Sequence, residues 1–253
     1  MTDSSPDAPA EPADQASTSA PTDAAPQAET RARRCTVLAD TEPVESLLEI
    51  KRSEFLGHLV RVETEEAARE HIERIRRRHH DARHVCSAFV LGPDRDVQRS
   101  SDDGEPAGTA GIPMLQALLS HRPDPLDPER ADLTDVCAIV VRWFGGIKLG
   151  AGGLVRAYTE AVTQTLDEAH LVTRSRRRLG TVPVEHARAG QLENELRAHG
   201  FALQDTEYAP DHAVLHLSVP DDPAAQEEAA ARLAALSSGQ ARITWGTVTW
   251  IDG

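Results

Sequence analysis

The first 36 residues of the chain lack the apolar side chains from which a folded core is built. No Val, Ile, Leu, Phe, Tyr or Trp occurs from Met1 to Thr36, and Ala, Pro, Ser, Thr and acidic residues fill the segment. Such a segment cannot bury enough apolar surface to offset the conformational entropy that ordering removes. The pattern therefore predicts that residues 1–36 form a disordered acidic tail rich in Ala and Pro.

Regular apolar spacing begins after this tail. Residues 44–62 alternate in a way that predicts two strands meeting near residues 51–53. Thr64 follows as a predicted N-cap, and an acidic first turn, an apolar stripe and three arginines at 76–78 are typical of a helix. Residues 84–91 are almost wholly apolar, and we predict a buried strand there.

The middle of the chain has the order strand, glycine loop, helix. Residues 136–141 are apolar and rich in β-branched side chains, which predicts a buried strand, and five of the nine residues from Gly145 to Gly153 are glycine. Beyond Gly153, apolar residues recur every three or four positions, as on an amphipathic helix. An acidic loop at residues 98–113 likewise precedes a predicted helix at 112–120. If the strands before these two loops are neighbours in one sheet, both loops open on one edge and form a shared groove.

The last third of the chain shows a second pattern. Its apolar spacing predicts, in order, a strand at 179–185, a helix at 187–199, strands at 201–208 and 212–219, a helix at 222–238 and a strand at 242–250. This βαββαβ order is that of a ferredoxin-like domain. We therefore expect two folded domains, residues 37–172 and residues 175–253.

Charge and cysteine content restrict the class of protein. The net charge is −14, and an acidic surface disfavours broad binding to duplex DNA, which needs a basic footprint. The three cysteines are far apart and form no CxxC motif, which favours a reducing compartment over a disulfide framework. No apolar run approaches the length of a membrane span. We expect a cytoplasmic protein that does not contact membranes.

The glycine loop has the features of an anion site. Glycine permits close backbone approach, and the first turn of a helix offers free N–H groups, so Lys148 and Arg156 are candidate counter-charges. Of the 27 basic residues only Lys51 and Lys148 are lysine, and one of the two stands in this loop. The loop fits neither the Walker motif nor the dinucleotide fingerprint, because Ala151 and Val155 replace the required Lys and Gly. Tight packing of the strand against the helix explains the glycines equally well.

The acidic loop also has two interpretations. Its carboxylates, those of Asp102, Asp103 and Glu105, are close enough in sequence to hold Mg²⁺ or to act as an acid and a base. The alternative is a turn closed by Asx hydrogen bonds, with a cap for the next helix. His80 and His84 lie near Asp81, but no cysteine pair or HExxH motif accompanies them, and we assign no metal site.

Four motifs make the chain recognisable. KRSEF at 51–55, HxDARH at 79–84, SSDDGEPAGTAGxP at 100–113 and RWFGGIKLGAGGLVRAY at 142–158 resemble the YigZ/IMPACT family. The resemblance covers roughly residues 35–170, and residues 175–253 are similar to the bacterial C-terminal domain of that family. It implies an α+β protein with an N-terminal ribosomal protein S5 domain 2-like αβ domain followed by a ferredoxin-like domain.

The resemblance also implies a role in the cytoplasm around translation, since eukaryotic relatives regulate translation under stress by binding a partner protein. We expect a non-enzymatic regulator or accessory factor that binds the ribosome, RNA or a translation-associated protein, without a cofactor. The alternative is a Mg²⁺-dependent enzyme acting on a nucleotide or another phosphorylated small molecule in the groove between loops 100–111 and 145–153. No catalytic residue is assigned. The residues expected in the groove are Ser101, Asp102, Asp103, Gly104, Glu105, Thr109, Arg142, Gly145, Gly146, Lys148, Gly150, Gly152, Gly153 and Arg156.

Overall fold

The computed structural model describes residues 30–253 apart from 125 and 128. The predicted disorder of residues 1–29 therefore lies outside the described residues. For the end of the expected tail the prediction is wrong, because strand β1 (Arg34–Leu38) begins inside it. β1 pairs antiparallel with a strand far along the chain, with Arg34 opposite Ser175, and its Cys35 is fully buried. Because that partner is remote in sequence, local composition gave no sign of it.

A five-stranded antiparallel sheet forms the centre of the first domain. Its order is β2-β3-β6-β4-β5, and its strands are β2 (Val44–Ile50), β3 (Ser53–Arg61), β4 (His84–Leu91), β5 (Val97–Ser101) and β6 (Val136–Trp143). β3, β4 and β6 are the apolar runs, and each has a partner on both sides. The predicted strands at 44–62, 84–91 and 136–141 are confirmed.

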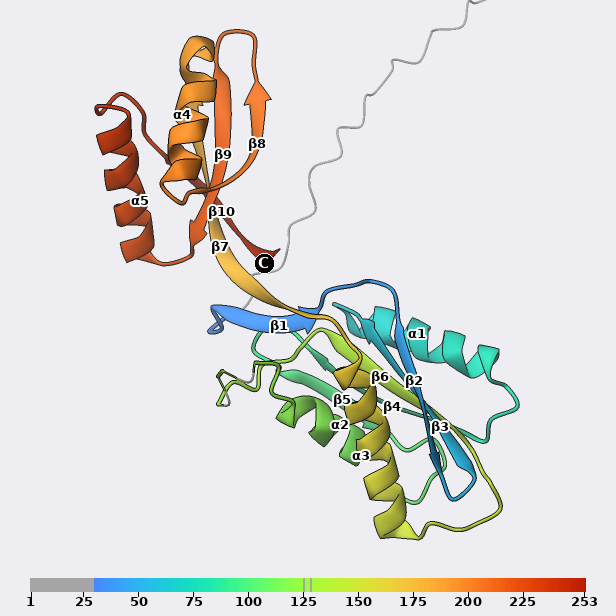
Figure 1. Ribbon diagram of the computed structural model, residues 1–253. Coiled ribbons are helices and arrows are strands. Elements are labelled where there is room, and N and C mark those ends of the chain that lie inside the picture. Colours follow the sequence, from blue (N-terminus) through green and yellow to red (C-terminus); the bar gives the residue numbers. More distant parts are fainter. Residues whose placement is uncertain (1–29, 125, 128) are drawn as a thin grey trace, which may run out of the picture.

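Helices cover both faces of this sheet (Figure 1). Helix α1 (Glu65–Arg78) lies on one face, where its Ile72 and Ile75 pack against Phe89 and Ile139 in one cluster. Helices α2 (Gly111–Ser120) and α3 (Ala151–Asp167) lie on the other face and bury a larger cluster that includes Phe55. The side chain of Thr64 accepts a hydrogen bond from the N–H of Ala67, so the predicted N-cap is confirmed.

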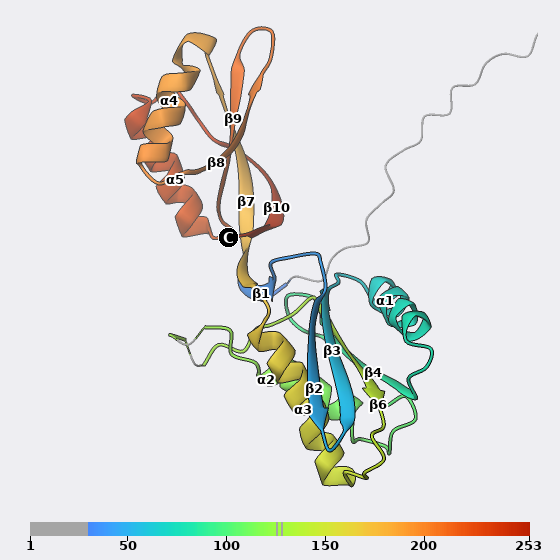
Figure 2. The same ribbon diagram turned by 45° about the vertical axis from the view of Figure 1, so that its right-hand side comes forward.

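The second domain has the predicted βαββαβ order. Its elements are β7 (Leu171–Val184), α4 (His186–Ala198), β8 (Ala202–Tyr208), β9 (Ala213–Pro220), α5 (Pro223–Leu236) and β10 (Thr244–Asp252). The strand order β10-β7-β9-β8, antiparallel throughout, is that of a ferredoxin-like sheet. Both helices cover the same face of it (Figure 2). The chain is thus an α+β protein with an αβ domain followed by a ferredoxin-like domain.

Strand β7 leads from the first domain into the second and belongs, with β1, to the second sheet. It runs without interruption through residues 173 and 174, where the expected boundary between the domains lies. Its first residues pair with β1, and its last residues pair with β9. An ion pair of 2.6 Å between Arg61 at the end of β3 and Asp252 at the end of β10 also links the domains. Within the described part of the chain, no helix is both long enough and apolar enough to span a bilayer.

Candidate functional site

The two loops singled out in the sequence open on the same edge of the first sheet. The strand predicted before the acidic loop, β4, is a neighbour of β6 as supposed, but the unpredicted β5 follows β4 in the chain and lies on its other side, so the strands that lead directly into the two loops are β5 and β6. Both are antiparallel to β4, so they run in the same direction and their loops leave at the same end. The turn from β2 into β3 lies at this end too, since Glu54 is opposite Trp143. In Figures 1 and 2 this is the end of the first domain away from the second domain.

A cavity of about 320 Å³ lies between the loops, and we call it the two-loop cavity. It is lined by Arg83, His84, Glu105, Pro106, Arg142, Phe144, Lys148, Leu149, Gly150, Ala151 and Leu154. Of the expected groove residues, the structure brings Glu105, Arg142, Lys148 and Gly150 together here. Most of the remaining expected residues form hydrogen bonds that hold the two loops or permit the backbone conformation of these loops, and one lines a different cavity.

Glu105 is held at the base of the cavity by two donors. Its Oε1 atom accepts hydrogen bonds from Arg142 Nη1 at 2.5 Å and from the Tyr158 hydroxyl at 2.9 Å. The side chains of Glu105 and Arg142 are only 4% and 7% exposed. The Arg142 guanidinium also lies over the rings of Phe55 and Phe144, with 5.3 Å and 5.7 Å to their centroids. Glu105 therefore positions Arg142 and has no free charge to offer a ligand.

Asp102 acts as a cap. Its Oδ1 accepts from the N–H groups of Ala110 at 3.0 Å and Gly111 at 2.8 Å, and its Oδ2 accepts from the N–H of Gly108 at 2.7 Å. Burial alone would raise the pKa of this carboxyl, but the three N–H donors outweigh burial and lower it. Asp102 thus satisfies the start of α2 and closes the loop, which is the second of the two interpretations of the acidic loop.

Asp103 ties the acidic loop to β4 and α1. Its Oδ2 accepts from the N–H of Val85 at 2.7 Å, and its Oδ1 accepts from Arg76 Nη2 at 3.1 Å. Its own carbonyl oxygen accepts a hydrogen bond of 2.9 Å from Nδ1 of His84, which fixes that ring at the cavity wall. Gly104 follows in the turn with φ +83°.

The glycines of the glycine loop, residues 145–153, have different structural roles. A Cβ at Gly145 would lie 1.9 Å from the carbonyl oxygen of Arg52, so the close approach of the β2–β3 turn requires glycine there. Gly146 and Gly150 have φ of +88° and +76°, and Gly150 is the N-cap of α3. Gly152 lies in the first turn of α3, and a Cβ there would meet nothing within 4 Å.

The remaining expected residues do not line the cavity. A Cβ on Gly153 would lie 2.9 Å from Cβ of Leu149, so this glycine permits local packing. The Thr109 hydroxyl donates to the carbonyl of Pro106 at 2.6 Å, and Arg156 Nε donates to the carbonyl of Gly152 at 3.2 Å. Ser101 lines a different cavity, on the α1 side of the sheet.

Cations dominate the two-loop cavity. Arg83, Arg142 and Lys148 line it, and the one carboxylate among its lining residues, that of Glu105, is already bound by Arg142 and Tyr158. The N-terminus of α3 adds a partial positive charge, because its first turn contains no acidic residue and Gly150 supplies no side-chain cap. On a chain of net charge −14 this is a local positive site.

Sequence reasoning missed most of the cavity wall. Arg83 and His84 belong to the HxDARH motif, which carries part of the family resemblance but does not by itself indicate a place in the groove. Phe144 and Leu149 are next to expected groove residues in the sequence. Apolar residues in a glycine loop nevertheless indicate packing in the core and not the wall of a ligand cavity. Only the pairing of β4 with β6 puts His84 opposite Arg142 and brings the two motifs together.

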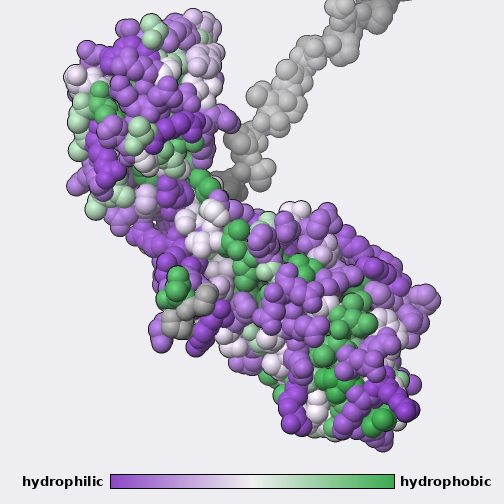
Figure 3. All heavy atoms as spheres, in the orientation of Figure 1, coloured by the Kyte–Doolittle hydropathy of each residue, from purple (hydrophilic) through white to green (hydrophobic). Residues whose placement is uncertain are grey.

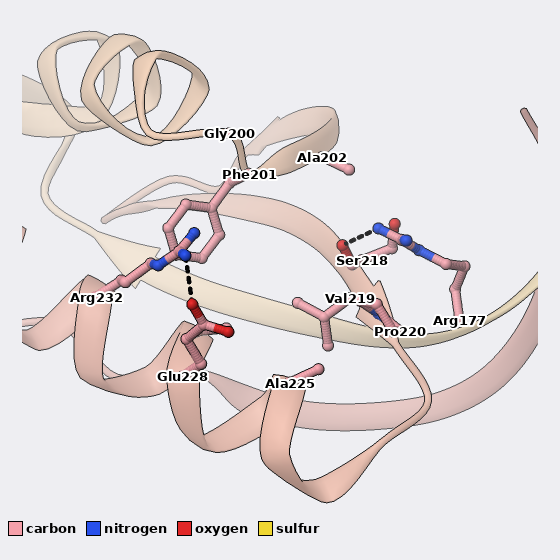
Figure 4. Close-up of a pocket in the computed structure, with 11 residues that line it drawn as sticks. Arg177, Gly200, Phe201, Ala202, Ser218, Val219, Pro220, Ala225, Glu228 and Arg232 are labelled. Carbon is pink, nitrogen blue, oxygen red and sulfur yellow. Dashed lines mark hydrogen bonds and ion pairs between the residues drawn. The ribbon is translucent and has the colours of Figure 1, made fainter.

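The second domain has a smaller cavity of about 170 Å³ between α5 and the sheet (Figure 4). Two of its charged side chains form an ion pair, Arg232 with Glu228, and Arg177 Nη2 donates to the carbonyl of Ser218 at 2.9 Å. Arg176 and Arg178, beside it on β7, both pair with Asp221. Arg177 is thus the only cation lining this cavity that has no ion pair among the described residues, whereas the two-loop cavity has two such cations, Arg83 and Lys148.

Comparison with known proteins covers both domains. The family model described as "Impact N-terminal domain" matches residues 51–166, and that described as "Domain of unknown function (DUF1949)" matches residues 182–240. "IMPACT family member YvyE" of Bacillus subtilis is 44% identical over 160 residues, which are 63% of this chain and 69% of that protein. "IMPACT family member YigZ" of Escherichia coli is 44% identical over 131 residues, which are 51% and 59%. A crystal structure described only as that of a hypothetical protein is 34% identical, covers 83% of this chain and 96% of its own, and has a TM-score of 0.52.

Proposed function

The chain belongs to the IMPACT family in its two-domain form, and we propose that it is a non-enzymatic accessory factor or regulator of translation. Its partner in this proposal is single-stranded RNA of the ribosome or of a translation complex, bound at the two-loop cavity. The relatives are named only by family, so the proposal rests on the resemblance and on the chemistry of the cavity.

The observation that carries the choice of RNA is the pairing of free cations with exposed apolar side chains. Lys148 and Arg83 are exposed at the cavity, and no ion pair to either one occurs among the described residues. Phe144 and Ile147 of the same loop are 48% and 44% exposed, although both are large and apolar. Single strands are bound by this combination, since cations attract the backbone and aromatic rings stack on bases.

The surface around the cavity is better suited to binding single-stranded RNA than to binding a duplex. Apolar surface is visible near this end of the first domain, where β2 turns into β3 (Figure 3). The positive charge is confined to a cavity of about 320 Å³ on an acidic chain, whereas duplex binding needs an extended basic footprint.

The competing function, a Mg²⁺-dependent enzyme, has less support. Each carboxylate of the acidic loop already accepts hydrogen bonds from protein donors, so none is ready to bind an ion or to remove a proton. Cys86 stands nearby, but burial raises the pKa of its thiol to about 12, which disfavours the thiolate that a nucleophile needs. The cavity has the size of a small-molecule site, and this is what keeps the enzyme as the second candidate.

Sedimentation of the protein with ribosomes tests the proposed function. In low-salt sucrose gradients we expect the wild type to sediment with ribosomal particles and Lys148→Ala to remain in the light fractions. Arg156→Ala is the matched control, because it removes one exposed cation of α3 that does not line the cavity. Loss of co-sedimentation after ribonuclease treatment indicates RNA, and its persistence indicates a protein partner. A wild type that never sediments with ribosomes or RNA contradicts the proposal.

A further inference from the structure

Arg142 has an unused hydrogen-bond donor. Its side chain is only 7% exposed and lines the two-loop cavity, and its Nη1 atom is bound to Glu105, whereas its Nη2 atom has no hydrogen-bond partner among the described residues and is not enclosed by protein atoms. An N–H of a buried charged group that lacks an acceptor is costly, and buried polar groups in native proteins are nearly always paired. The unused donor therefore points to an acceptor that arrives with a ligand.

The start of α3 supplies further donors to the same cavity. Gly150 and Ala151 both line it. The hydrogen bonds that reach the carbonyl oxygen of Gly150 come from Gly153 and Leu154, so the N–H groups of Ala151 and Gly152 have no partner within the helix. Free N–H groups at the N-terminus of a helix bind anions, and phosphate above all.

The remaining cations reach the cavity from other directions. Lys148 comes from the glycine loop, and Arg83 is the residue before β4. The His84 ring donates from Nδ1 to the carbonyl of Asp103 and forms part of the cavity wall. The donors thus belong to a helix, a strand and two loops, and they surround a space of about 320 Å³.

We propose that the two-loop cavity binds a phosphomonoester, the terminal phosphate of a nucleotide, through Arg142 Nη2, Lys148 and the first N–H groups of α3. A phosphomonoester carries nearly two charges and three free oxygens, so it can accept from donors on several sides at once. A phosphodiester inside a strand has one charge and two free oxygens, and it uses such a site incompletely. Two ligands could supply this phosphomonoester. The first is the phosphorylated end of an RNA, and for this ligand the inference rests on the proposed function. A free mononucleotide is the other source of the same group.

Ala151→Asp is the sharpest test variant. The new carboxylate lies in the first turn of α3, where the helix dipole favours a negative charge, so the fold is kept while phosphate is repelled. The control is Ala187→Asp, which puts the same exposed charge in the first turn of α4 in the second domain. Lys148→Ala is the second test variant, because Lys148 is exposed and removing it cannot unfold the core. Thermal unfolding of each variant checks that the fold is intact.

Three probes separate the possibilities in binding titrations. They are a short single-stranded RNA with a 5′-phosphate, the same RNA with a 5′-hydroxyl, and adenosine monophosphate. We expect the wild type and Ala187→Asp to bind the phosphorylated RNA at least about tenfold more tightly than the hydroxyl form, as is typical of added charge-assisted hydrogen bonds. In Ala151→Asp and Lys148→Ala this preference should fall to about twofold or less.

Each outcome bears on one claim. Equal binding of the two RNAs to the wild type overturns the phosphomonoester site and leaves the proposed RNA function standing. Binding of adenosine monophosphate alone, lost in Ala151→Asp, supports the site and contradicts the RNA function. A preference for the phosphorylated end that Ala151→Asp does not change overturns the placement of the site. If no probe binds the wild type, both proposals are wrong.

Discussion

Arg142 and Glu105 form an ion pair that is almost removed from water, with 2.5 Å between Arg142 Nη1 and Glu105 Oε1. Tyr158 donates to the same oxygen, so the carboxylate has two donors, while Nη2 of the guanidinium has no partner among the described residues. The acidic residue closest to the cavity is thereby used to hold a cation in place. The pair itself carries no net charge, so the positive charge of the cavity comes from Lys148, Arg83 and the N-terminus of α3.

Breaking this pair should destabilise the fold strongly. Glu105→Ala leaves a buried guanidinium without its partner, and such a loss typically costs about 3–5 kcal/mol of unfolding free energy. Glu193→Ala is the control, because it removes one partner of a surface pair with Arg197 and should cost less than about 1 kcal/mol. Urea denaturation measures both. Equal losses in the two variants would show that the Glu105–Arg142 pair is as weak as a surface pair.

Asp102 should contribute stability without contributing to binding. Asp102→Ala removes the acceptor of three backbone N–H groups, and we expect a loss of about 2 kcal/mol, at the upper end for a helix cap. Because the folded pKa of Asp102 is lowered, its stabilisation is present above the unfolded pKa of about 3.9 and is lost as the pH falls through the folded pKa. Denaturation at pH 7 and pH 3 checks this, since the cost of Asp102→Ala should shrink in acid. A cost that stays constant would mean that the ionised carboxylate is not what caps α2.

Two glycine substitutions should have opposite effects. Gly145→Ala puts a methyl group into the carbonyl of Arg52, and we expect a loss of about 2–3 kcal/mol from this overlap. Gly152→Ala adds a methyl group in open space within a helix and should stabilise the protein by about 0.5–1 kcal/mol. Thermal unfolding of the two variants tests both signs. A destabilised Gly152→Ala would show that the first turn of α3 is not regular helix.

A buried pair of histidines makes stability depend on pH. His58 Nε2 and His71 Nε2 lie 2.6 Å apart beneath α1, and His58 Nδ1 lies 3.0 Å from Glu45 Oε1. Burial, aided by the charges of His58 and Arg74, lowers the pKa of His71 to about 4, and burial also lowers the pKa of His58. As the pH drops from about 6.5 to about 4, the two histidines become protonated in the unfolded chain but stay neutral in the folded chain. The free energy of unfolding should therefore fall over this range.

The size of this effect can be measured with His71→Gln. A pKa lowered from about 6.5 to about 4 corresponds to a loss on the order of 3 kcal/mol across that window. In His71→Gln the loss should be much smaller, whereas the exposed His80→Gln should behave as the wild type does. Unfolding free energies at pH 7, 5.5 and 4.5 give the comparison. A wild type and His71→Gln with parallel pH curves would contradict the role of this pair.

The sequence predicted local features well and long-range pairing poorly. Alternation and helical spacing are local, so the βαββαβ order of the second domain and the N-cap at Thr64 are confirmed. Strand β1 and the first residues of β7 depend on each other across the whole first domain, and no local pattern near Cys35 indicated a strand.

The candidate site shows the same limit. Lys148 and Arg142 stood out by residue type and by motif, and the structure places both at the cavity. Asp102 and Asp103 stood out for the same reasons, yet their carboxylates bind backbone N–H groups of their own surroundings. Residue type cannot tell a carboxylate that faces a ligand from one that closes a turn, because the difference is made by which N–H groups the fold brings within reach.

Ultraviolet cross-linking of single-stranded RNA to the protein, followed by mapping of the linked peptide, tests the central claim most directly. We predict that the cross-link falls within residues 142–150, at the exposed Phe144, and that Lys148→Ala reduces its yield several-fold while Arg156→Ala does not. Cross-links confined to the second domain, or a yield that Lys148→Ala leaves unchanged, would contradict the assignment of the two-loop cavity as the RNA site.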